Sequence, residues 1–196
     1  MSKSDPSSSK KERNKTIRWV VTIFIVTIFV SALFSLASTE VLSVSSIPVA
    51  FVILLVIVFV GIVFDVIGMA VATADEKPFH SMAARKVPGA QESIMLLRNA
   101  ERVSSICNDV IGDICGVISG SASASIAAQI LMGFEGFSWP QAISLLMSAL
   151  VAGLTVGGKA IGKGFAISSC TRIVSSVGKL IWGLKNIPQL LKKKKS

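Results

Sequence analysis

Apolar residues gather in four long runs along the chain, and short polar connections separate these runs. The runs cover residues 19–36, 49–74, 106–132 and 139–157. A helix needs about 20 predominantly apolar residues to cross the hydrocarbon core of a bilayer. The second run is rich in β-branched residues, but its length and its lack of turn residues favour a helix over a buried strand. The pattern therefore predicts an all-α membrane protein with four transmembrane helices.

The polar segments predict two further helices outside the bilayer. A turn at Val87–Gly89 precedes helical spacing of apolar residues over 90–103, which predicts a cytoplasmic helical connection between the second and third spans. Residues 165–196 carry apolar side chains on one face, basic side chains on the other and a closing lysine tail. This pattern is typical of an amphipathic helix beside the membrane. Residues 1–17 are rich in serine and lysine, which predicts a disordered basic tail.

Basic residues set the expected orientation of the four spans. The connections at 37–48 and 133–140 contain no lysine or arginine, whereas both ends of the chain are basic. The middle connection carries five basic residues: Lys77, Arg85, Lys86, Arg98 and Arg102. Because cytoplasmic loops are enriched in lysine and arginine, we expect a multi-pass protein of the cell membrane with both termini in the cytoplasm. Trp19 and Trp139 fall at the predicted interfaces, where indole rings prefer to lie.

The first apolar run has a second interpretation, a cleavable secretory signal peptide. Its basic start and apolar stretch fit that interpretation, and the letters SLASTE offer a candidate cleavage site. An apolar stretch of about 18 residues is long for a signal peptide, however, so an uncleaved span at 18–38 is favoured.

The composition supports a membrane location and argues against an enzyme. Hydrophobic residues make up 52% of the chain and charged residues 16%, against roughly 25% charged residues in an average soluble domain. Mean hydropathy is +0.70. The single histidine, His80, lies outside the apolar runs, and neither a Ser-His-Asp set nor a zinc-ligand spacing is present. With a net charge of +9, the basic segments are expected to meet the anionic inner leaflet rather than a nucleic acid.

Four polar residues inside the apolar runs are the candidate functional residues. Asp65 lies in the second run, and Asn108, Asp109 and Asp113 lie in the third. A carboxylate in hydrocarbon costs several kcal/mol, so it is expected to face the bundle interior and to have a partner. Small and polar residues recur beside them at three- or four-residue spacing, which predicts one helix-contact face: Ser105, Gly112, Gly116, Gly120 and Ser123. Since carboxylate and amide oxygens suit Mg²⁺, the four residues form a predicted metal site.

Three motifs resemble a known family of membrane domains. They are FDVIGMAVATA at 64–74, LLRNAERVSSICNDVIGDI at 96–114 and GKAIGK at 158–163. These segments are similar to motifs of the DUF21 transmembrane domain, which occurs in the cyclin M and CorB/CorC magnesium and cobalt transporters. The resemblance implies that residues 49–163 form this domain, with the span at 18–38 added in front. It also implies a divalent-cation transporter.

The resemblance implies a role for five positions, with clear departures from the family. Asp65 stands at a serine position of the family's magnesium site, and Asn108 and Asp109 stand at two asparagine positions. Lys159 replaces the family's glutamate, and Gly162 replaces its proline. The CBS domain pair that follows in the family is not part of this sequence. A separate regulatory protein is therefore one candidate partner, and a second copy of the chain is another, because family members dimerise.

Lys159 separates two functional hypotheses. If its ammonium group enters the cavity, it pairs with Asp65 or Asp109 and occupies the cation site. The chain would then be a non-transporting scaffold or a regulatory subunit. If Lys159 instead extends to the membrane surface, the carboxylates are free to hold a divalent ion, Mg²⁺ in the first place, and the chain would be a transporter. The sequence leaves both hypotheses open.

Overall fold

The structure is a computed structural model, and it describes residues 6–133 and 140–193, with side chains for 17–36, 45–132 and 141–186. Helices alone make up the regular structure of these residues. In chain order they are α1 (Pro6–Val44), α2 (Ile47–Thr73), α3 (Lys77–Ala84), α4 (Ala90–Arg98), α5 (Ala100–Ser105), the π-helix η1 (Ile106–Gly112), α6 (Asp113–Gly133), α7 (Pro140–Ser168) and α8 (Cys170–Lys193). The predicted all-helical class is confirmed.

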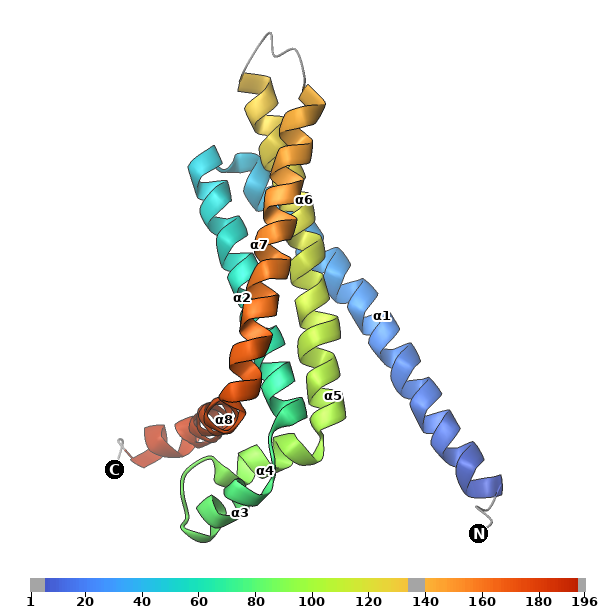
Figure 1. The fold of residues 1–196 in the computed structure, drawn as a ribbon, viewed down its shortest axis with the longest axis vertical. Helices are drawn as coiled ribbons and strands as arrows, with labels where there is room; N and C mark the ends of the chain where they lie inside the picture. Colours follow the sequence, from blue (N-terminus) through green and yellow to red (C-terminus); the bar gives the residue numbers. More distant parts are fainter. Residues whose placement is uncertain (1–5, 134–139, 194–196) are drawn as a thin grey trace.

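Four helical stretches are long and apolar enough to cross a membrane, as the sequence predicts. They are Ile17–Leu36, Ile47–Thr73, Ala100–Met132 and Gln141–Ser168. The helices run alternately up and down, so the start of α1 and the end of α8 lie at the same end of the bundle (Figure 1). The chain thus has the helices of a multi-pass integral membrane protein. Which end faces the cytoplasm stays a prediction.

Two of the predicted spans have different bounds in the structure. The third begins at Ala100 rather than near residue 106, because α5, η1 and α6 follow one another without a break in helical structure. The fourth continues to Ser168 rather than ending near residue 157, because the glycine-rich stretch after that point stays helical. The predicted interface residue Trp139 lies outside the described residues.

Helix α2 lies at the centre of the bundle and packs against both α6 and α7. Buried side chains from these three helices form its main apolar cluster: Ala50, Leu54, Val58, Ala122, Ile126 and Val151. Glycines bring α7 close to α2. A Cβ atom on Gly162 would lie 2.7 Å from Val66 Cγ2, and one on Gly158 would collide with Ile62. Close approach through small residues is a usual way for helices to pack in membranes.

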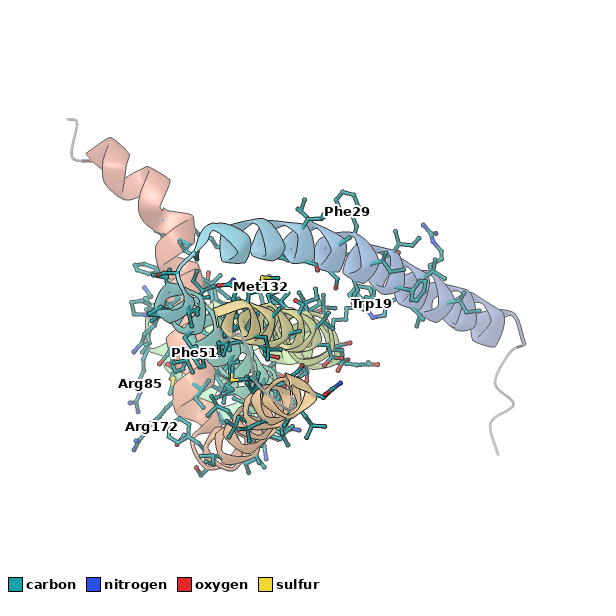
Figure 2. The ribbon with its side chains drawn as sticks, turned by 90° about the horizontal axis from the view of Figure 1, so that it is seen from above. Trp19, Phe29, Phe51, Arg85, Met132 and Arg172 are labelled. Atoms are coloured by element: carbon teal, nitrogen blue, oxygen red, sulfur yellow. The ribbon has the colours of Figure 1, made fainter. Side chains whose placement is uncertain are left out.

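Helix α1 leans away from the other spanning helices and packs mainly on α6 (Figures 1 and 2). Its Ile23 and Val30 contact a small cluster on η1 and α6, whereas Phe29 is 72% exposed on the side away from the bundle. The Arg102 guanidinium lies 5.1 Å from the Trp19 ring centroid, a cation–π contact that ties α1 to α5.

Helices α3, α4 and α8 gather at one end of the bundle. The predicted turn before residue 90 is confirmed: Gly89 has a φ of 83°, which favours glycine. The predicted helix over 90–103 is interrupted at Asn99, whose φ of −113° and ψ of 28° end α4 and begin α5. The Asn99 side-chain amide donates to the Met95 carbonyl and so fastens this break.

The predicted amphipathic helix is α8, but part of it packs on protein. Ser93 of α4 is fully buried, and its hydroxyl lies 2.9 Å from the Gly89 carbonyl and 3.2 Å from the Val174 carbonyl. A Cβ on Gly178 would collide with Ser93 Oγ, so the backbone of α8 lies directly against α4 where the two helices cross. Leu180 and Leu184 remain exposed on α8, and these side chains are available to a membrane surface.

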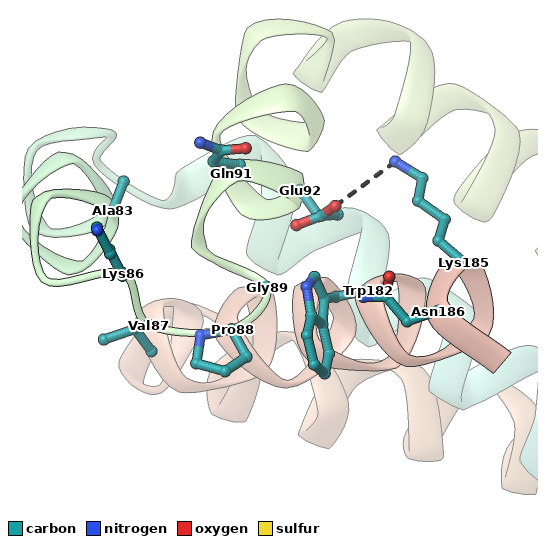
Figure 3. A pocket seen from close by; sticks show the side chains of 10 residues that line it. All are labelled: Ala83, Lys86, Val87, Pro88, Gly89, Gln91, Glu92, Trp182, Lys185 and Asn186. Atoms are coloured by element: carbon teal, nitrogen blue, oxygen red, sulfur yellow. Dashed lines mark ion pairs between the residues drawn. The ribbon is translucent and has the colours of Figure 1, made fainter. Parts of the chain in front are cut away.

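A weak ion pair joins α8 to α4 at the edge of a hollow of about 340 Å³. Lys185 Nζ lies 3.6 Å from Glu92 Oε1 (Figure 3), and Trp182 of α8 and Pro88 of the turn both line the hollow. Because the Lys185 side chain is more than half exposed, the pair adds no more than a few tenths of a kcal/mol. Backbone packing around Ser93 is therefore the main attachment of α8.

Candidate functional site

A buried ion pair lies inside the helix bundle. Lys159 Nζ of α7 is 3.5 Å from Asp65 Oδ1 of α2. The Asp65 side chain is 6% exposed and that of Lys159 is 22% exposed. Gly112 of η1 lies against the pair: a Cβ there would be 3.3 Å from the ammonium and 3.4 Å from the carboxylate. Glycine at this position lets a third helix approach the two charges.

Two side-chain oxygens at this site have no hydrogen-bond partner within the described part of the chain. They are Asp65 Oδ2 and Asn108 Oδ1, and both are buried. The Asn108 amide nitrogen donates to Ser104 Oγ at 3.3 Å, while Oδ1 lies against Gly68 of α2. A buried polar atom left without a partner costs about 1–3 kcal/mol. Both oxygens belong to the contact between α2 and η1.

Asp109 and Asp113 do not join this group. Both residues are exposed on the outer face of η1 and α6. Asp109 Oδ2 accepts a hydrogen bond of 2.7 Å from Ser105 Oγ. Of the four predicted ligands, two have buried oxygens in the contact between α2 and η1, Asp65 and Asn108. Among the described residues, no three His, Cys, Asp or Glu side chains lie close enough to share a metal ion.

Only part of the expected polar face of the third span is buried in a helix contact. Gly112 and Ser123 are buried against neighbouring helices, whereas Asp109, Asp113 and Gly120 are exposed. The prediction that the whole face points into a contact is therefore wrong for the two aspartates. Helical spacing shows which residues share a face, but packing decides how far that face turns toward a neighbour.

The π-helix is the feature of the site that the sequence did not predict, whereas Gly112 belongs to the predicted helix-contact face. Asn108 and Gly112 both lie in η1, and π-helical turns often occur at functional sites. Gly68 and Gly112 make room for the polar groups, in keeping with the close approach that a glycine within an apolar helix indicates. No comparable signal distinguishes a π-turn from an α-helical one in this stretch.

No protein-family model matches this chain, and no curated protein or solved structure is significantly similar to it. The resemblance to the magnesium and cobalt transporter domain therefore stays a prediction, carried by the motifs alone. The structure does show where the positions implied by the resemblance lie. Three of the positions implied by the resemblance, Asp65, Asn108 and Lys159, lie around the same helix junction.

Proposed function

We propose that this chain is an integral membrane protein that binds a cation within its bundle and carries it as a transporter does, with Mg²⁺ as the first candidate ion. The observation that carries the proposal is two buried, unpartnered oxygens, Asp65 Oδ2 and Asn108 Oδ1, in the contact between α2 and η1 at which the ion pair of Asp65 with Lys159 also lies. Intramembrane ionisable residues are costly, and they commonly mark ion pathways.

A purely structural role explains these oxygens poorly. A buried ion pair gains stability only when hydrogen bonds satisfy its remaining lone pairs. Here the carboxylate of Asp65 has one oxygen near Lys159 and the other without a partner in the described structure. Two such oxygens together would cost about 2–6 kcal/mol. That cost is easier to explain if the oxygens coordinate a ligand during function.

The ligand set suits a magnesium ion that keeps part of its hydration shell. Mg²⁺ is usually bound through one or two carboxylates and several waters, at near-octahedral geometry. Asp65 would supply the carboxylate and Asn108 the amide oxygen. Lys159 would have to withdraw, because its ammonium group lies 3.5 Å from Asp65 Oδ1. Its side chain is long and partly exposed, so it can move its charge toward water.

The ion pair itself favours a second function, that of a non-transporting scaffold or regulatory subunit. If the Lys159 ammonium group is a permanent counter-ion of Asp65, the site is neutral without any transported cation. The bundle would then serve to hold a partner protein in the membrane. The two functions differ in whether the Lys159 ammonium group exchanges with an external cation.

Magnesium flux into proteoliposomes containing an entrapped indicator distinguishes the two functions. We expect flux in the wild-type protein and at least a tenfold loss in Asp65→Asn. Asp75→Asn is the matched control, because Asp75 is an exposed carboxylate after the end of α2. The control should keep wild-type flux. A wild-type protein that is folded and gives no flux would overturn the transporter proposal in favour of the scaffold.

A further inference from the structure

A narrow hollow of about 180 Å³ runs along the junction of α6 and α7, and we call this junction the seam. Small and hydroxyl-bearing residues line it, with Gly116 and Gly120 on α6 and Ser148, Ala152 and Thr155 on α7. A Cβ on either glycine would meet no neighbour within 4 Å in the described structure. The seam is therefore open rather than filled by side chains of this chain.

Two carboxylates lie exposed along the same helix as the seam glycines. Asp109, Asp113 and Gly120 are exposed, at spacings that place them on one side of η1 and α6. Asp113 is seven residues beyond Ile106, where the apolar run begins, which is about 10 Å along the helix. At that depth a carboxylate facing lipid would cost several kcal/mol. Water or protein must therefore cover this side.

The ion pair lies one helical turn beyond the seam on α7. Lys159 follows the seam residue Thr155 by four positions, so the two residues share one side of α7, although Lys159 does not itself line the hollow. Its ammonium group reaches Asp65, whose side chain is 94% buried and whose Oδ2 is unpartnered. The Thr155 hydroxyl donates to the Val151 carbonyl at 2.7 Å, and its oxygen can still accept a hydrogen bond from water.

We propose that the seam is a water-filled cleft through which a hydrated cation reaches Asp65, with Asp113 and Asp109 supplying negative charge along the way. This inference rests on the proposed function, because it assigns an access path to the same site. The three acidic groups attract cations, and the glycines leave width for a hydration shell. Lys159 stands at the inner end of the path and separates the cleft from Asp65.

Cysteine accessibility in lipid nanodiscs tests the cleft without any transport assay. Cys107, Cys115 and Cys170 are first replaced by alanine, and single cysteines are then introduced. Gly120→Cys and Ala152→Cys place a thiol in the seam on α6 and on α7. Val117→Cys and Leu154→Cys are the matched controls, since they place a thiol at exposed apolar positions of the same two helices. A membrane-impermeant methanethiosulfonate reagent is the probe.

The expected result is labelling of both seam thiols at least tenfold faster than both control thiols. Labelling after denaturation shows that each thiol is present, and elution as a single species shows that each variant is folded. If Gly120→Cys does not fold, Ala152→Cys carries the same test from α7. Seam thiols that react as slowly as the controls would overturn the cleft, including the case in which a second copy of the chain covers the seam.

A companion experiment separates failure of the cleft from failure of the transporter proposal. Asp113→Asn should lower magnesium flux about tenfold at low Mg²⁺ concentration, because negative charge near an entrance raises the local cation concentration. Asp113→Glu, which keeps the charge, should restore it. Unreactive seam thiols with Asp65-dependent flux would mean that the cation takes another path. Reactive seam thiols without flux would mean that the cleft is hydrated but the proposed function is wrong.

Discussion

Removing one member of the buried ion pair should have very different effects, depending on which member is removed. At 3.5 Å and an effective dielectric constant of about 20, the attraction between Asp65 and Lys159 is about 5 kcal/mol before the cost of desolvation. Lys159→Met leaves a carboxylate that is 94% buried and has no counter-charge. We expect this variant to lose about 3–5 kcal/mol of unfolding free energy.

Asp65→Asn leaves Lys159 without its counter-ion, and this loss should cost less stability. The Lys159 side chain is 22% exposed and has a flexible stem, so it can turn its ammonium group toward water. We therefore expect a loss of only about 1 kcal/mol in the free energy of unfolding. The double variant Asp65→Asn with Lys159→Met should be more stable than Lys159→Met alone, because it contains no buried unpaired charge.

The wild-type protein, the two single variants and the double variant form a double-mutant cycle. Reversible unfolding in mixed detergent micelles measures the free energy of unfolding of all four. We expect a coupling energy between the two substitutions well above the roughly 0.5 kcal/mol scatter of independent sites. We also expect Lys159→Met to be the least stable of the four proteins. Equal losses in the two single variants, or losses that add in the double variant, would refute the idea that the bundle contains a desolvated charge pair.

The Lys159→Met variant also tests whether the Lys159 ammonium group competes with a cation for Asp65. Under the transporter proposal, Lys159→Met vacates the position next to Asp65, so Mg²⁺ should bind more tightly and raise the melting temperature of this variant. A ligand at 100 times its dissociation constant adds about 2.7 kcal/mol. If Mg²⁺ changes the melting temperature of Lys159→Met no more than that of Asp65→Asn, the site does not bind the ion.

The remaining predictions concern the close helix contacts, and for each the control is the same substitution at a nearby glycine that has open space around it. Gly158→Leu should destabilise the bundle by about 1–3 kcal/mol in micelle unfolding, because the new side chain meets Ile62 of α2. Gly157→Leu has open space in the described structure and should change stability little, so equal losses would argue against this packing. Gly178→Ala should loosen α8 and speed its cleavage in limited proteolysis, whereas Gly183→Ala should not, and equal cleavage rates would contradict the crossing at Ser93.

The spanning helices could be predicted from the sequence because one physical requirement dominates them. A lipid core demands a continuous apolar stretch of a set length, and that demand is visible in composition alone. The bounds were less predictable. Ala100–Met132 begins with charged residues that a hydropathy pattern places outside the membrane, and only the continuous backbone joins them to the span.

The candidate site was only partly predictable, because contacts between helices depend on rotation about their axes. The sequence identified Asp65 and Asn108 as polar groups in apolar helices and offered the pair of Asp65 with Lys159 as one of two outcomes. The structure contains this ion pair, and the function that follows from it stays a prediction. It also turns Asp109 to the outer face, although its neighbour Asn108 is in the site. Adjacent residues point about 100° apart, and no spacing rule says which of them meets a partner.

The packing around the ion pair limits how a cation could exchange with Lys159. Gly158 and Gly162 hold α7 against Ile62 and Val66 of α2, and these contacts lie on both sides of the ion pair along each helix. A shift of α7 relative to α2 would break both contacts at once. The side chain of Lys159 is less constrained, because it is 22% exposed and has a flexible stem. Exchange should therefore occur by motion of the Lys159 side chain, while the contact between α2 and α7 stays fixed.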